Sequence, residues 1–187
     1  SYRLDNAVKY TGRFGGFTAR AMLGLGEVAS QTSALSSRGL GLAYAASGFT
    51  VSSAFQTFKA ADQRTLDGAT LGVAYQWGTL RLAANAARSK AETAAGKHTV
   101  QRVMSAGATW SITPQADLTA AYYKVDRTRT GATDDGYGRL VAFAEYKLSR
   151  RTKVYAELDN TRWRHGFQGA ANQASATGVS AGVVHLF

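Results

Sequence analysis

The amino-acid sequence predicts an all-β fold, an antiparallel sheet that crosses a membrane as a transmembrane β-barrel. Apolar and polar residues alternate with a period of two along most of the 187 residues. Short turns and long polar loops alternate between these runs, as is typical of membrane-spanning barrels. No run of about 18 consecutive apolar residues occurs, so strands are the remaining way to cross a bilayer.

The alternation is clearest over residues 69–77 and 80–87. One face of the first segment carries Ala69, Leu71, Val73, Tyr75 and Trp77. Each predicted strand has about the 9–11 residues that a tilted strand needs to cross a bilayer. The eleven predicted strands are 4–10, 16–26, 38–46, 49–58, 67–77, 79–89, 99–111, 116–126, 137–148, 151–162 and 176–187.

The predicted connections fall into two classes. The long polar loops are 27–37, 59–66, 90–98, 127–136 and 163–175. The short turns are 47–48, 77–78, 113–115 and 149–150. The only proline, Pro114, falls in a short turn, where its missing N–H breaks no ladder hydrogen bond.

One face of each predicted strand is apolar and free of charge, and the other face is small, polar or charged. A soluble barrel would turn its apolar face inward. We expect the opposite here, because a charge facing lipid costs roughly 2–4 kcal/mol at the bilayer midplane. The charged residues expected to line a water-filled lumen are Lys9, Arg20, Arg81, Asp117, Arg139, Glu145, Lys147, Lys153, Glu157 and Asp159.

Basic side chains dominate this polar face and would raise the local concentration of anions. Arg20, Arg81 and Arg139 are the best candidates for that role. The alternative is that these arginines only neutralise neighbouring carboxylates.

Four aromatic residues lie beside short turns. We expect them to form an aromatic girdle at the level of the lipid headgroups. Each could alternatively be an ordinary core residue. The four are Tyr75, Trp77, Trp110 and Tyr146.

The sequence offers no catalytic or cofactor-binding constellation. The absence of Cys removes disulfides, thiolate metal sites and a cysteine nucleophile. His98, His165 and His185 are far apart and lack metal-ligand spacing. Asp134 and Asp135 form an acidic pair that we expect to be solvated in a loop. We therefore expect no enzyme activity, no metal and no cofactor.

The formal net charge of +10 supports polyanion binding only weakly. The basic cluster Arg150, Arg151 and Lys153 spans a tight turn and has no flanking pattern of stacking aromatics. We expect no nucleic-acid partner.

The last predicted strand alternates towards a C-terminal phenylalanine. Val179, Ala181, Val183, His185 and Phe187 share one face. Such an ending resembles the sorting signal that the outer-membrane assembly machinery reads, with Val183, His185 and Phe187 as its carriers.

Three segments, taken together, carry a resemblance over essentially the whole chain. They are 5–17 (DNAVKYTGRFGGF), 146–158 (YKLSRRTKVYAEL) and 182–187 (GVVHLF). The chain resembles the sixteen-stranded trimeric general porins of Gram-negative outer membranes.

The resemblance implies an outer-membrane location and a passive, weakly anion-selective diffusion channel for small hydrophilic solutes and ions. It also implies a homotrimer in contact with the lipid bilayer and lipopolysaccharide. Eleven strands without a constriction loop further imply that residues 1–187 form a single domain, the C-terminal portion of the full barrel.

Three other classes stay open at this point. A translocator or anchoring barrel of the autotransporter kind would have a helix ahead of its first strand. A barrel enzyme of the outer membrane would need a Ser or an Asp–His pair near the outer rim. A soluble β-rich binding protein would have the two faces inverted.

Overall fold

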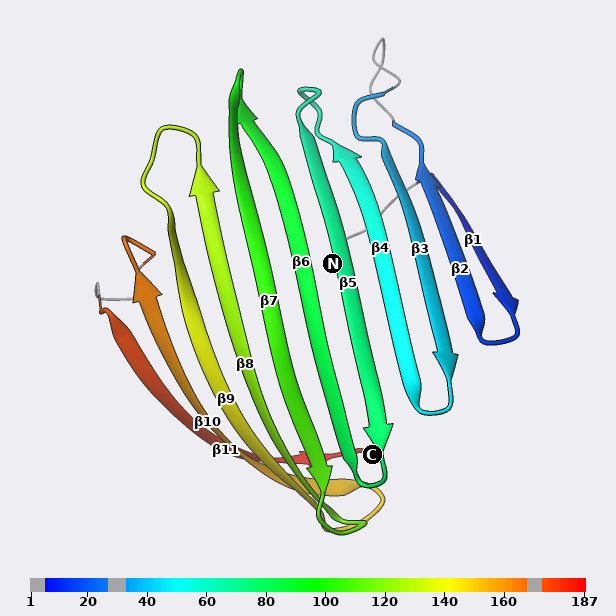
Figure 1. The fold of residues 1–187 in the computed structure, drawn as a ribbon, viewed down its shortest axis with the longest axis vertical. Helices are drawn as coiled ribbons and strands as arrows, with labels where there is room; N and C mark the ends of the chain where they lie inside the picture. Colours follow the sequence, from blue (N-terminus) through cyan, green and yellow to red (C-terminus); the bar gives the residue numbers. More distant parts are fainter. Residues whose placement is uncertain (1–5, 27–32, 168–172) are drawn as a thin grey trace. The chain divides into compact units, whose positions relative to one another are not determined.

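The computed structural model describes residues 6–26, 33–167 and 173–187. The described residues form eleven strands (Figure 1). Within these ranges, no helix is long and apolar enough to cross a membrane. The strands are β1 (Ala7–Phe14), β2 (Phe17–Gly24), β3 (Ser37–Ala46), β4 (Phe49–Lys59), β5 (Thr65–Trp77), β6 (Leu80–Ala94), β7 (Lys97–Ser111), β8 (Ala116–Arg129), β9 (Asp135–Lys147), β10 (Thr152–Arg164) and β11 (Ser175–His185).

Each strand pairs with the next strand along the chain. The sheet order is β1-β2-β3-β4-β5-β6-β7-β8-β9-β10-β11, and Figure 1 shows this succession by colour. Pairing between sequence neighbours follows from the connections, because a tight turn can join only antiparallel strands. The prediction of an all-β antiparallel fold with eleven strands is confirmed.

The chain divides into two compact units. The first comprises residues 1–73, 86–102 and 127–133, and the second comprises 74–85, 103–126 and 134–187. Strands β1 to β4 belong to the first unit and β9 to β11 to the second. Strands β5 to β8 contribute their long-loop ends to the first unit and their short-turn ends to the second.

In the first unit, the register separates polar from apolar side chains. Lys9 stands opposite Met22, and Thr11 stands opposite Arg20. Residues directly opposite in an antiparallel pair share a face of the sheet. The other face carries pairs such as Ala21 with Leu40, and Leu40 is 67% exposed.

In the second unit, the register of β9 and β10 agrees with the predicted faces. Lys153 stands opposite Lys147, and Leu158 stands opposite Ala142. Among the described residues, only Ala34, Val100 and Val125 are buried apolar side chains. A water-soluble domain of this size buries most of its large apolar side chains. The exposed apolar face therefore fits contact with lipid.

Several predicted boundaries are wrong because strand pairing continues into polar segments. The predicted long loop 90–98 is a hairpin in which only residues 95–96 connect β6 to β7, with Gly96 at φ +69°. His98 consequently lies on β7 and not in a loop. The side chain of Glu92 accepts hydrogen bonds from the N–H and the hydroxyl of Thr65, at 3.3 and 3.4 Å. Outside the bilayer both faces of a paired strand meet water, so a run of polar residues does not end a strand there.

The first strand also differs from its prediction. Residues 4 and 5 of the predicted strand 4–10 lie outside the described residues, and its predicted end is wrong, because β1 continues to Phe14 and a tight turn with Gly15 at φ +58°. The positive φ favours glycine at this position. The connections 60–64 and 130–134 are shorter than the predicted loops 59–66 and 127–136 because the flanking strands extend further.

Gly136 gives a test of the packing between β8 and β9. A Cβ at Gly136 would overlap the carbonyl oxygen of Val125, and backbone cannot move aside cheaply. We expect Gly136→Ala to destabilise the fold by roughly 1–3 kcal/mol. The measurement is the urea midpoint of the protein folded in detergent micelles.

Gly41→Ala serves as the matched control. A Cβ there would meet its nearest atom, the carbonyl oxygen of Ser53, at an ordinary 3.6 Å. Its urea midpoint should stay at the wild-type value, and equal midpoints for the two variants would contradict the packing argument.

The connection between β4 and β5 supports a second prediction, because it is closed by an ion pair. The Arg64 side chain binds Asp62, and the Arg64 N–H donates to Asp62 Oδ1 at 3.2 Å. The hydrogen bond from the Arg64 side chain holds the pKa of the Asp62 carboxyl below its usual range. The stability that this ion pair contributes is fully present above the pKa of Asp62 in the unfolded chain. It is lost as the pH falls through the lower pKa of Asp62 in the folded protein.

We expect Arg64→Ala to raise the pKa of Asp62 back towards the ordinary value of an aspartate carboxyl, because the hydrogen bond from the Arg64 side chain is lost. The measurement is a titration of the Asp62 carboxyl carbon by NMR. Lys59→Ala, which removes a nearby base that does not bind Asp62, should leave that pKa in place. An unchanged pKa in the Arg64 variant would sink the assignment.

Candidate pore-lining face

Side chains of opposite character occupy the two faces of the sheet. We call the face that carries Lys9, Arg20, Glu145 and Lys153 the charged face, and the opposite face, with Leu40 and Leu158, the apolar face. Contacts between side chains extend the charged face to β8 and β7, because Lys147 binds Asp117 and Asp117 accepts a hydrogen bond from Ser111.

Two lysines on the charged face have a carboxylate each. Lys147 Nζ lies 3.0 Å from Asp117 Oδ2, and Lys153 Nζ lies 2.7 Å from Glu145 Oε2. Lys147 and Lys153 stand directly opposite each other on β9 and β10. Like charges in that position repel. The two carboxylates offset the repulsion, so these residues make a nearly neutral patch beside the short turns.

Arg139 is also paired. Its guanidinium lies 3.2 Å from Asp159 Oδ1, and the side chains of Arg139 and Asp159 are 43% and 20% exposed. For Arg139 the geometry therefore favours the alternative left open by the sequence, that it neutralises a neighbouring carboxylate.

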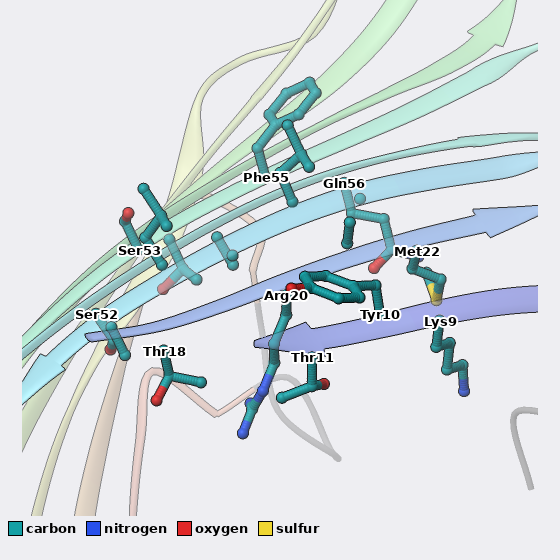
Figure 2. Close-up of a pocket in the computed structure, with 18 residues that line it drawn as sticks. Lys9, Tyr10, Thr11, Thr18, Arg20, Met22, Ser52, Ser53, Phe55 and Gln56 are labelled. Atoms are coloured by element: carbon teal, nitrogen blue, oxygen red, sulfur yellow. The ribbon is translucent and has the colours of Figure 1, made fainter. Parts of the chain in front are cut away.

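Lys9, Arg20 and Arg81 are different. All three are exposed, and none makes an ion pair with any other described residue. Figure 2 shows Lys9 and Arg20 projecting from one side of the sheet while Phe55 lies on the other side.

Small and hydroxylic residues surround these free bases. Arg20 is flanked by Thr11 on β1 and by Gly41 on β3. Arg81 lines a hollow with Asn85 and Ser105. Hydroxyl and amide groups can hydrogen-bond a partly hydrated ion. The surroundings of Arg20 and Arg81 are therefore compatible with the passage of such an ion.

Glu157 makes no ion pair with another described residue either. Of the ten charged residues predicted to line the lumen, three bases and three acids are paired with one another. Three bases and one acid therefore remain without an ion pair to another described residue.

The expectation that the apolar face is free of charge is wrong at the long-loop ends of the strands. Arg38 stands opposite Leu23 and Thr57, so it lies on the apolar face. The reason is length, since β6 and β7 have 15 residues and outrun the hydrocarbon thickness. In the sequence, the alternation of side chains that continues through residues 88–92 was the signal that the strands extend this far. The charged residues that follow the apolar ones on this face are Arg38, Lys59, Asp67, Arg88, Lys90, Glu92, Arg102, Lys124, Asp126, Arg162 and Arg164.

The four predicted girdle aromatics are exposed, with Trp77 at 70%. None of Tyr75, Trp77, Trp110 and Tyr146 is buried, and their place in an aromatic girdle stays a prediction. Sequence reasoning missed Phe14, Phe17, Tyr44 and Phe49, which flank two further short turns. The rings of Phe17 and Tyr44 lie 4.5 Å apart between centroids.

The predicted assembly-signal residues lie on the apolar face of β11 and just beyond it. Val183 stands opposite Val154 and is 67% exposed. The Nδ1 atom of His185 lies 2.9 Å from the hydroxyl of Thr152, and its ring packs against Phe187 at 5.0 Å. Their role as a signal stays a prediction.

The remaining candidates do not come together. Within the described ranges, no group of three His, Cys, Asp or Glu side chains could hold a metal ion. His165 lies in the connection after β10 at φ +54°. Asp135 opens β9 and is buried, which corrects the expectation of a solvated pair with Asp134.

Solved structures share this fold. The chain is similar to an anion-selective porin from Comamonas acidovorans, with 21% identity and a TM-score of 0.81, over 97% of this chain and 59% of that one. It is similar to OmpT, an outer membrane protein of Vibrio cholerae, with 13% identity and a TM-score of 0.78, over 96% and 63%. A trimer form of the same Vibrio cholerae protein matches with 14% identity and a TM-score of 0.70, over 96% and 64%.

The chain thus spans about three fifths of the length of the structures it matches. At these identities the likeness shows the fold alone. No curated protein matches the chain.

Sequence comparison supplies the family. A model described as Gram-negative porin matches residues 1–166, which is most of the chain. The predicted resemblance and the predicted location in the bacterial outer membrane are confirmed. With the fold, the two-faced strands and this match together, the chain belongs to the Gram-negative porin family.

Proposed function

We propose that this chain forms part of a water-filled channel through which small hydrophilic solutes and ions diffuse passively across the outer membrane. The observation that carries the proposal is the division of the strands into an exposed apolar face and a charged face. Lipid accepts the first face at no cost, and only water accepts the second. The mechanism uses no cofactor and no chemical step.

The free bases support a weak preference for anions. Lys9, Arg20 and Arg81 act without a bound carboxylate, while Glu157 opposes them. Fixed positive charge beside low-dielectric walls raises the local concentration of anions and repels cations. The structural likeness to a porin that is anion-selective agrees with this sign.

The complete protein assembles as a homotrimer in this proposal, as the trimer form of the Vibrio cholerae protein does. Its apolar face meets the lipid bilayer, and the closing strand is read by the outer-membrane assembly machinery through Val183, His185 and Phe187. The translocator, anchoring and enzyme alternatives receive no support from the family or from the similar structures.

Selectivity is tested by separating free from paired charges. A unit charge acting through water over about 7 Å is worth about 0.6 kcal/mol, a factor of about three. We expect each of Arg20→Gln and Arg81→Gln to lower the chloride-to-potassium permeability ratio by about that factor. Glu157→Gln should raise the ratio. The measurement is the reversal potential in a planar bilayer under a KCl gradient.

The double variant Arg139→Gln/Asp159→Asn is the control, because it removes a complete ion pair and leaves the net charge unchanged. Its reversal potential should match the wild type. A cation preference in the wild-type protein, or a larger effect of the control than of Arg20→Gln, would refute the assignment of the free bases.

The orientation of the two faces is tested with the three tryptophans. Trp77 and Trp110 lie on the apolar face beside short turns, while Trp163 stands opposite Tyr137 on the charged face. In variants that keep one tryptophan, nitroxide-labelled lipid should quench Trp77 and Trp110 strongly and Trp163 weakly. Iodide in the water should show the reverse order. Quenching of Trp163 by the lipid label would mean that the faces are inverted.

A further inference from the structure

Glu157, on β10, differs from the other acids predicted to line the lumen, because it makes no ion pair with another described residue. Asp159, two residues further along the same face, is bound by Arg139. Glu145, on β9, is bound by Lys153. These two bases are therefore already neutralised, and Glu157 adds a local negative charge to this part of the charged face.

Two aromatic rings flank the carboxylate of Glu157. Phe143 on β9 stands directly opposite Glu157, and Tyr155 precedes Glu157 by two residues on β10, so the three side chains share the charged face. The ring centroids of Phe143 and Tyr155 lie 5.7 Å apart, and the ring planes differ by 24°. Because the planes are nearly parallel, the two rings turn their faces in nearly the same direction. Both side chains are half-buried, so each ring keeps surface that a ligand can contact.

Strand β11 leaves room beside these side chains. Gly182 stands opposite Tyr155, and Ser180 stands opposite Glu157. A Cβ at Gly182 would lie 2.7 Å from the hydroxyl oxygen of Tyr155, so the phenol leans over the glycine. Ser180 is small and exposed. A ligand that contacts Glu157 therefore has space on the β11 side.

A free carboxylate beside two aromatic faces favours a bulky organic cation. The face of an aromatic ring carries negative charge and attracts a cation within about 6 Å of its centre. An inorganic cation such as K⁺ holds its water and gains little from a ring. An alkylated ammonium ion is weakly hydrated, so it can contact the rings while its charge lies near the carboxylate. An anion would be repelled by Glu157, and a neutral solute would gain nothing from its charge.

We infer that Phe143, Tyr155 and Glu157 form a binding site for quaternary ammonium compounds. This inference rests on the proposed function, since it takes the charged face to border the water of the lumen. A quaternary ammonium group has no N–H to donate, so rings and a carboxylate satisfy it without further hydrogen-bond acceptors. The site gives a channel that weakly favours inorganic anions a local affinity for organic cations.

The test measures the binding of choline to the complete protein in octyl glucoside micelles, by saturation-transfer NMR. The neutral probe is 3,3-dimethyl-1-butanol, which has the shape of choline with carbon in place of the charged nitrogen. We expect the neutral probe to bind roughly ten-fold more weakly, because it loses the attraction to the rings and to the carboxylate. Equal binding of the two probes would overturn the inference.

Variants of the site separate the ring from the rest of the side chain. We expect Glu157→Gln and Tyr155→Leu each to weaken choline binding roughly two- to five-fold. Tyr155→Phe keeps the ring and should bind choline as the wild type does. A Tyr155→Phe protein that binds as weakly as Tyr155→Leu would contradict a role for the ring face.

Asp134→Asn is the matched control for charge, since it removes the same charge from the connection between β8 and β9. Its affinity for choline should equal that of the wild type. A loss as large as that of Glu157→Gln would mean that choline responds to net charge alone, and the site would be refuted.

Conductance of KCl across a planar bilayer keeps this result apart from the proposed function. All the variants should form open channels, which also shows that they fold. A protein that binds choline through Glu157 without conducting would refute the channel alone. A conducting protein whose choline binding is unaltered by Glu157→Gln would refute the site alone.

Discussion

The structure depends on one constraint, that every backbone N–H and C=O inside a bilayer must find a partner within the protein. Strands satisfy it by pairing with their neighbours, and the order β1 to β11 does so with the shortest connections. Pairing in turn fixes the faces, because a one-residue slip would move every side chain to the other side. The register that sets Lys153 against Lys147 and Leu158 against Ala142 therefore also separates water from lipid.

Pairing also decides which charges remain available. Neighbouring strands bring Lys147 to Asp117, Lys153 to Glu145 and Arg139 to Asp159. These pairs stabilise strand contacts modestly, since exposed ion pairs are worth about 0–1 kcal/mol each. Their larger effect is to cancel charge. A net charge of +10 consequently says little about selectivity until the free bases are separated from the paired ones.

The features that depend on alternation alone could be predicted from the sequence. The eleven strands, their faces and the exposed aromatics such as Trp77 follow from a period of two. It did not predict the partner of Arg139, because that contact depends on the register between β9 and β10. Residues 90–98 were predicted to form a loop because they are polar. Polar composition indicates a loop only where the pairing of strands stops. Thr65 and Glu92 show that pairing continues there.

The same alternation of side chains has different consequences at different positions along a strand. On β6 the apolar face begins with Leu80 and Leu82, and continues with Arg88 and Lys90. In the proposed orientation a charge at the level of Leu82 would meet acyl chains and be costly, whereas Arg88 and Lys90, further along the strand, lie beyond the hydrocarbon. Because one strand crosses both regions, the requirement to pair the backbone extends the sheet past the hydrocarbon. The sheet thereby places Arg88 and Lys90 past the residues that would meet acyl chains.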